Sequence, residues 1–162
     1  MHISIILIVV FIAYIFLLSA KYCPSRHIMI VYDKSNHDTP KKIIGPGQVA
    51  YVFPFTTEYV YLSLMPIAVS IQEVIFKDSI SETFNFNVAV SQNEKDWKNA
   101  AKYLAGLSEG EIKKLAKDLI KTEMLEIAKE ATLADYYKDK QYLKHINHKL
   151  GKIGLELIQR KI

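Results

Sequence analysis

The first twenty residues place the strongest constraint on this chain. Ile3 to Ala20 is an apolar run without charge, proline or glycine, and Lys21 follows it directly. At about 1.5 Å rise per residue, such a run would form a helix of roughly 27 Å, close to the roughly 30 Å apolar thickness of a bilayer. Inside lipid every backbone N–H and C=O must be paired, which one isolated segment achieves only as a helix. The run therefore predicts a transmembrane anchor over residues 1–22.

The run is expected to lie in lipid as a helix. The predicted membrane-spanning residues are Ile3, Ile5, Leu7, Val9, Phe11, Ala13, Phe16, Leu18 and Ala20. A cleaved secretory signal is the alternative, but it would need a basic stretch before the run, where only Met1 and His2 stand. Lys21 and Arg26 follow the run, so the positive-inside tendency predicts a single-pass protein of the cell membrane with its remaining chain in the cytoplasm.

Charge and cysteine content restrict the partners of the remaining chain. The 21 Lys and Arg and the 17 Asp and Glu all follow the apolar run, so the net charge of +4 belongs to the residues after it. A basic domain near an anionic leaflet gains about 1 kcal/mol per well-placed Lys or Arg. No aromatic and basic motif or Cys/His finger indicates a nucleic acid partner. The single cysteine, Cys23, excludes an internal disulfide.

The pattern of apolar residues changes once along the chain. Short runs rich in Val, Ile, Tyr and Phe predict strands at 27–32, 48–53, 59–64, 67–76 and 83–90. A Gly-Pro-Gly turn at 45–47 and prolines at 54 and 66 separate several of them. In the last run Phe84, Phe86 and Val88 alternate with polar residues, so we expect that row to hold the sheet to its helices.

After Asn93 the spacing of apolar residues becomes helical. A short helix is expected from Trp97 to the glycine at 106, and Ser108 with Glu111 predicts a capping box for a second helix. A third helix is expected from Thr132 to about Leu150, followed by a strand at 155–162. Strands first, then helices, then one returning strand indicate the α+β fold class.

Several segments in this order carry a resemblance to a known family. They are CPSRHIMIVYDK, the Gly-Pro-Gly turn before QVAYVFPF, YVYLSLMPIAVSI, and the stretch from NAAKYLAGLSEGEIKK to KLGKIGLELI. Together they resemble the flotillin branch of the SPFH superfamily, which comprises stomatin, prohibitin, flotillin and HflK/C proteins. The resemblance covers residues 23–162 and implies one prohibitin-homology domain with a curved, mostly antiparallel β-sheet flanked by helices.

The resemblance also implies a function. Flotillin-like proteins are non-catalytic, associate with the lipid bilayer, form homo-oligomers and organise membrane microdomains as scaffolds. The chain shows no heptad run long enough for the coiled coil of that branch, so we expect either a fragment or truncated form or a minimal member whose contacts are confined to the globular domain. The alternative is a regulator of a membrane protease, like HflK/C or prohibitin relatives. A membrane-bound hydrolase is a third possibility, which would need a reactive nucleophile.

Candidate chemistry is otherwise scarce. No nucleophile and base motif, phosphate loop or complete metal-ligand set is recognisable, so no catalytic residue and no cofactor is expected. His145 and His148 share a helical face but lack further ligands. Cys23 is a candidate lipidation site because it follows the apolar run, although an unmodified cysteine is the more ordinary state. Lys113, Lys117 and Lys121 form an i, i+4 stripe that could face lipid phosphates or a partner protein, or be an ordinary solvated face.

Overall fold

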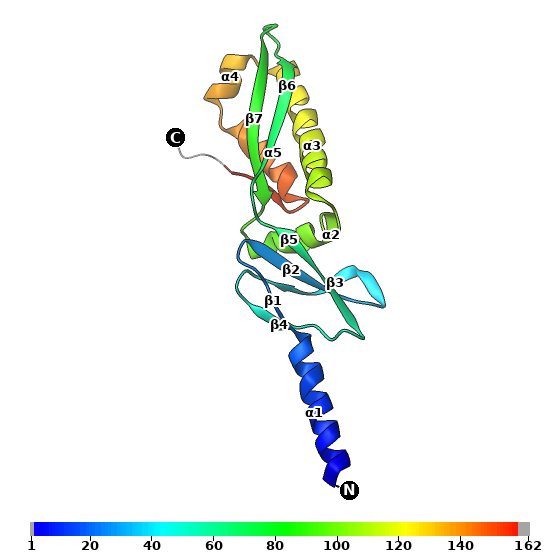
Figure 1. Ribbon diagram of the computed structural model, residues 1–162. Helices are drawn as coiled ribbons and strands as arrows, with labels where there is room; N and C mark the ends of the chain where they lie inside the picture. Colours follow the sequence, from blue (N-terminus) through cyan, green and yellow to red (C-terminus); the bar gives the residue numbers. More distant parts are fainter. Residues whose placement is uncertain (1, 159–162) are drawn as a thin grey trace. The chain divides into compact units, whose positions relative to one another are not determined.

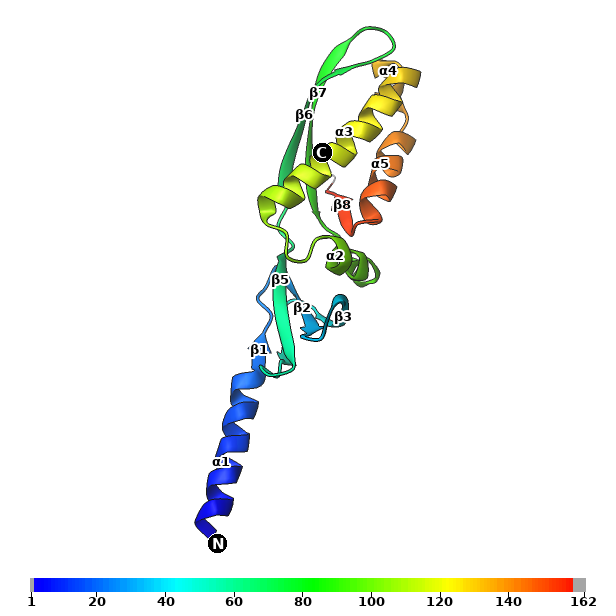
Figure 2. The same cartoon turned by 90° about the vertical axis from the view of Figure 1, so that its right-hand side faces the viewer.

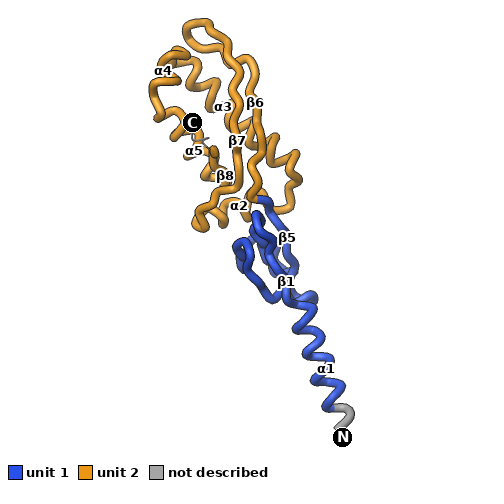
Figure 3. The backbone as a smooth tube through the Cα atoms, turned by 60° about the vertical axis from the view of Figure 1, so that its left-hand side comes forward, with its two compact units in different colours: residues 1–63 blue, residues 64–162 orange. Residues whose placement is uncertain are grey.

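The computed structural model describes residues 2–158, with side chains from residue 5 onward. Its contacts group the chain into two compact units, unit 1 at Met1–Ser63 and unit 2 at Leu64–Ile162 (Figure 3). The expected α+β class is confirmed, since antiparallel strands and helices are both present. The strands form three separate antiparallel sheets, where the sequence predicted one continuous curved sheet.

Unit 1 contains one helix and five strands (Figure 1). They are α1 (His2–Ser19), β1 (Ala20–Tyr22), β2 (His27–Asp33), β3 (Asn36–Ile44), β4 (Val49–Tyr51) and β5 (Thr57–Ser63). Strands β1 and β4 form a two-stranded ribbon, and a second sheet has the order β3-β2-β5. The predicted anchor over residues 1–22 was wrong at its end, because the helix stops at Ser19 and Ala20 already pairs with Tyr51 in the ribbon.

The Gly-Pro-Gly segment makes the tight turn that joins β3 to β4. Gly47 has a φ of +76°, and the N–H of Gln48 donates to the carbonyl of Gly45 at 3.3 Å. Proline second and a positive-φ glycine third are typical of a type II turn. The N–H of Gly47 donates to the carbonyl of Cys23 at 2.9 Å, so this turn also holds the residue that follows β1 in place. The predicted turn is confirmed.

Unit 2 packs helices onto a three-stranded sheet of order β6-β7-β8 (Figure 2). Its elements are β6 (Ile67–Ile75), β7 (Ser81–Val90), a short 3-10 helix η1 (Glu94–Asp96), α2 (Trp97–Tyr103), α3 (Glu109–Glu130), α4 (Leu133–Lys138), α5 (Gln141–Gly151) and β8 (Leu155–Leu157). Helix α3 packs on β6, and α5 packs on both α3 and β8. The single helix expected from Thr132 to Leu150 is two helices, since the chain leaves helical geometry at Asp139.

Side-chain caps fix where the helices of unit 2 begin. The Ser108 hydroxyl accepts from the N–H of Glu111, whose carboxylate accepts from the N–H of Ser108 at 2.8 Å. Thr132 and Asp135 form the same reciprocal pair at the start of α4. Each pair satisfies two backbone donors that a helix start leaves open. Hydrogen bonds from Ser108 lower the pKa of Glu111, so its carboxylate stays ionised beside the positive end of α3.

Aromatic rings hold α4 against the far end of the β6–β7 hairpin. The ring of Tyr136 lies 5.1 Å from that of Phe84 and 5.8 Å from that of Phe76. Burial raises the pKa of Tyr136 to about 12. The predicted inward row on β7 is confirmed for Phe84 and Val88, whereas Phe86 is only half-buried.

A close backbone approach completes unit 2. Gly154 has a φ of +80°, and a Cβ built there would lie 2.3 Å from the backbone nitrogen of Ala100 in α2. The carbonyl of Gly154 accepts from the N–H of Ser91 at 2.9 Å, which brings β8 beside β7. Only a residue without a Cβ allows both the left-handed turn and this contact.

Replacement of Gly154 by alanine should therefore lower the free energy of unfolding by more than about 2 kcal/mol. The left-handed conformation alone costs an L-residue about 1–2 kcal/mol, and the contact with Ala100 adds to it. Denaturant unfolding followed by the fluorescence of Trp97 measures the change. Gly110→Ala is the matched control, because Gly110 lies in α3 with nothing within 4 Å and should gain up to about 1 kcal/mol. Equal effects of the two variants would contradict the role of Gly154.

Candidate functional site: an exposed apolar surface and two charged clefts

Helix α1 exposes nearly all of its apolar side chains within unit 1. Leu7, Val9, Phe11 and Leu18 are between 48% and 65% exposed, and Ile5, Ala13 and Phe16 are exposed as well. The side chain of Ile3 lies outside the described residues, and Ala20 is exposed in strand β1. A contiguous apolar surface of this extent marks a site that binds a protein or a membrane.

Over the part of the chain that the structure describes, no helix combines the length and the hydropathy of a complete membrane crossing. The prediction that Ile3 to Ala20 spans a bilayer is therefore without support from the structure.

Aromatic residues at the base of α1 extend this exposed surface. The ring of Phe16 meets those of Tyr51 and Phe53 edge to face, at centroid distances of 6.4 and 5.9 Å. Tyr51 is 63% exposed, and Phe55, two residues beyond Phe53, is 78% exposed. We call α1 together with Tyr51, Phe53 and Phe55 the apolar surface of unit 1. Tyrosine and other aromatic rings at the end of an apolar helix are typical of a membrane–water interface.

The helix continues into the β1–β4 ribbon without a loop. Ser19 is fully buried, its hydroxyl donates to the carbonyl of Ile15 at 2.7 Å, and its carbonyl accepts from the N–H of Val52 at 2.7 Å. The base of α1 is thus packed on Tyr51 of β4 and hydrogen-bonded to Val52, the residue that follows this strand. Residues 15–20 are part of the folded structure of unit 1.

Cys23 lies in the core of unit 1. Its side chain has no exposed area and packs with Met29, Val31, Ile44, Ala50 and Val52. The thiol donates to the carbonyl of His27 at 3.2 Å, and burial raises the pKa of Cys23. Acylation needs an accessible sulfur with thiolate character, and this environment provides neither. The position of Cys23 therefore argues against the predicted lipidation.

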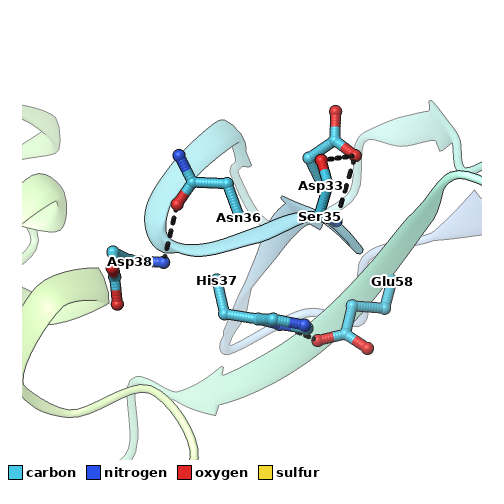
Figure 4. A network of polar contacts seen from close by, with 6 residues as sticks. All are labelled: Asp33, Ser35, Asn36, His37, Asp38 and Glu58. Carbon is cyan, nitrogen blue, oxygen red and sulfur yellow. Dashed lines mark hydrogen bonds and ion pairs between the residues drawn. The ribbon is translucent and has the colours of Figure 1, made fainter.

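A polar network occupies the exposed end of the β2–β3 hairpin (Figure 4). The Nδ1 of His37 lies 2.6 Å from a carboxylate oxygen of Glu58, and Asp33 accepts hydrogen bonds from the backbone and hydroxyl of Ser35. The Ser35 hydrogen bonds, with a smaller contribution from Lys41, lower the pKa of Asp33. These side chains are solvated and satisfy the turn, so they form no enclosed site. Within residues 2–158 no His, Cys, Asp and Glu group with the geometry of a metal site is found.

The three lysines predicted as a stripe lie exposed along α3 in unit 2. Lys113 and Lys117 border a cleft of about 570 Å³ whose other wall is the β6–β7 hairpin, including Ser70, Asn85 and Phe86. Lys121 lies outside that cleft. None of the three forms an ion pair with a described residue. The predicted stripe is therefore available as a basic surface.

A second cleft, of about 480 Å³, opens on the C-terminal half of α3. It is lined by Glu123, Glu126, Ile127, Glu130, Asp139, Gln141, Tyr142 and His145. Glu123 is buried, with 6% of its surface exposed, and one carboxylate oxygen lies 3.1 Å from the Nζ of Lys149. Its Oε2 lies 2.9 Å from the Nε2 of His145, yet accepts no hydrogen bond of acceptable geometry from a described residue. The sequence prediction did not include Glu123. The local feature that could have identified it is an acidic residue among the buried apolar positions of α3.

Selective modification should report the burial of Cys23. In the folded full-length protein we expect its reaction with an aromatic disulfide reagent to be at least about 100-fold slower than after denaturation, because the sulfur is enclosed and protonated. Absorbance of the released thiolate measures the rate. Ser25→Cys in a Cys23→Ala background is the control, because Ser25 is exposed two residues away. Fast reaction of native Cys23, or an acyl adduct in the intact mass, would show that the sulfur is accessible.

Residues 23–162 match the model described as SPFH domain / Band 7 family. No curated protein matches the chain.

Proposed function

Because the chain belongs to the SPFH domain / Band 7 family, we propose that it is a membrane-bound scaffold that self-associates and organises membrane microdomains, as flotillins do. Members of this family are generally non-catalytic, membrane-associated scaffolds or regulators. The observation that carries the proposal is the apolar surface of unit 1, which has the chemistry of a lipid-binding surface at the start of the family domain.

The composition of α1 favours lipid over water by a large margin. Thirteen Ile, Leu, Val and Phe residues lie between positions 3 and 18. At about 0.3–0.6 kcal/mol each, their insertion contributes about 4–8 kcal/mol in favour of the membrane. A helix also pairs its own backbone groups, which is the condition for entering lipid. We therefore propose that α1 inserts into the bilayer and tethers the family domain to it.

Integration of residues 15–20 into unit 1 favours an uncleaved anchor. Removal of the chain up to Ala20 would take away the acceptor of the Val52 N–H and the ring that packs on Tyr51 and Phe53. It would also leave β4 without its paired strand at Ala20. A secretory signal has no such role in the mature fold, because it is discarded.

Confinement of the domain to the membrane plane makes self-association easier. Two-dimensional tethering raises the effective concentration of neighbouring copies, so a weak lateral contact becomes populated without a large interface. Such an array gathers lipids and membrane proteins rather than transforming a substrate. Copurification of the chain with a membrane protease in fixed stoichiometry, without homo-oligomers, would favour the regulator alternative instead.

Charge placed on α1 tests the membrane proposal. Ile8→Asp together with Ile12→Asp should release most of the full-length protein from anionic vesicles, because each aspartate in the middle of a membrane helix costs about 2.5–3.5 kcal/mol. Flotation on a density gradient measures the bound fraction. Ile75→Asp with Ile80→Asp is the matched control, since both side chains are exposed in unit 2 and should leave binding unchanged. Undiminished flotation of the α1 variant would contradict insertion of α1.

Orientation forms a separate part of the proposal. With Lys21 and Arg26 beside the membrane, we propose a single pass with the residues after Ala20 in the cytoplasm. An N-terminal epitope on the full-length chain should then resist protease added from the cytoplasmic side, whereas an epitope after residue 162 should be digested. Digestion of both epitopes from that side would show that α1 lies in one leaflet.

A further inference from the structure

Helix α3 has opposite charges on its two flanks. Its sheet-facing side buries Ile112, Ala116 and Ile120. Lys117 and Glu126 are nine residues apart, and at about 100° per residue this places them on opposite sides of the helix. One flank borders the β6–β7 hairpin and carries Lys113 and Lys117, while the other borders Asp139 and α5 and carries Glu126 and Glu130. We call these the basic flank and the acidic flank.

The acidic flank contains a buried acceptor that the fold leaves open. Glu123 lines the acidic cleft with 94% of its surface removed from solvent, and its Oε2 accepts no acceptable hydrogen bond from a described residue. His145 is charged only when protonated, so Lys149 is the one permanent cation paired with this carboxylate among the described residues. A buried carboxylate oxygen without a donor is destabilising. A cation bound at the mouth of the cleft would stabilise this carboxylate electrostatically without touching it.

The charges around the cleft also favour a cation. Neither Glu126 nor Glu130 forms an ion pair with a residue that the structure describes. With Asp139 they place three further carboxylates on the same lining. The basic flank has the complementary composition, because Lys113 and Lys117 are exposed and similarly unpaired. The chain therefore presents both halves of a charge-complementary contact.

We propose that the acidic flank of one copy binds the basic flank of the next, with the Lys117 ammonium of one copy donating to the exposed Glu126 of its neighbour. This inference rests on the self-association proposed above and names the surfaces that form it. Each copy uses two different surfaces, so the contact is heterologous and extends from copy to copy instead of stopping at a dimer. The half-buried Phe86 ring, which borders the basic flank, supplies the apolar part of the contact.

Charge reversal of the full-length protein in nanodiscs or detergent micelles tests this contact. Lys117→Glu and Glu126→Lys should each raise the concentration needed for half-maximal assembly at least tenfold, as measured by mass photometry or sedimentation. The double variant should assemble like the wild type, because its two flanks are again complementary. An equimolar mixture of the two single variants should also assemble, since each can bind only the other. Either recovery also shows that the single variants remain folded.

Matched controls separate this contact from a general effect of charge. Lys98→Glu and Glu94→Lys alter exposed residues of unit 2 outside both clefts and should assemble normally. Zero-length coupling of amines to carboxylates in wild-type assemblies should join Lys117 to Glu126 of another copy. Wild-type assembly that neither single reversal weakens, or that the controls weaken equally, overturns the inference while leaving the scaffold proposal in place. A wild type that stays monomeric on membranes overturns the proposed self-association itself.

Discussion

The carboxylate of Glu123 holds the helical layer of unit 2 together. It projects from α3 toward α5, where Lys149 and His145 approach its two oxygens. Since α5 leads through Gly154 into β8, and β8 pairs with β7, the position of this carboxylate influences the edge of the sheet as well as the helices. Removing one partner of such a buried ion pair lowers the free energy of unfolding far more than replacing both partners with apolar groups. Removal of Glu123 or of Lys149 alone would therefore loosen the packing of α5 on α3.

The sequence predicted most elements whose apolar residues follow one period. Four strand predictions and the capping box at Ser108 agree closely with the structure, because alternation and reciprocal capping are local properties. Strand β3 was missed, since it is a polar edge strand that contains Pro40 and is largely exposed. Only its pairing with β2 makes it a strand, and that partner is not visible in the local pattern. The break at Asp139 was missed for a related reason, because Thr132 to Leu150 keeps a helical spacing on both sides of it.

For the candidate sites too, local features could be predicted and features that depend on packing could not. The exposed lysine stripe could be predicted, because positions four apart on a helix share a face whatever surrounds it. The acidic cleft could not, since its lining comes from α3, α5 and Asp139 before α5, and depends on how those helices pack. For Cys23 the local sequence was misleading. Its place after the apolar run suggested an interfacial thiol, whereas the turn at Gly47 and the neighbouring strands enclose the sulfur.

The unbroken passage from α1 into β1 has a mechanical consequence. A helix joined through a flexible linker tilts freely when the bilayer becomes thicker or thinner. Here the buried Ser19, with its hydrogen bond to Val52, and the packing of Phe16 on β4 connect helix and ribbon rigidly. With α1 inserted as proposed above, any tilt of the helix would rotate the ribbon or strain its base, so that bilayer thickness would act as a torque on unit 1.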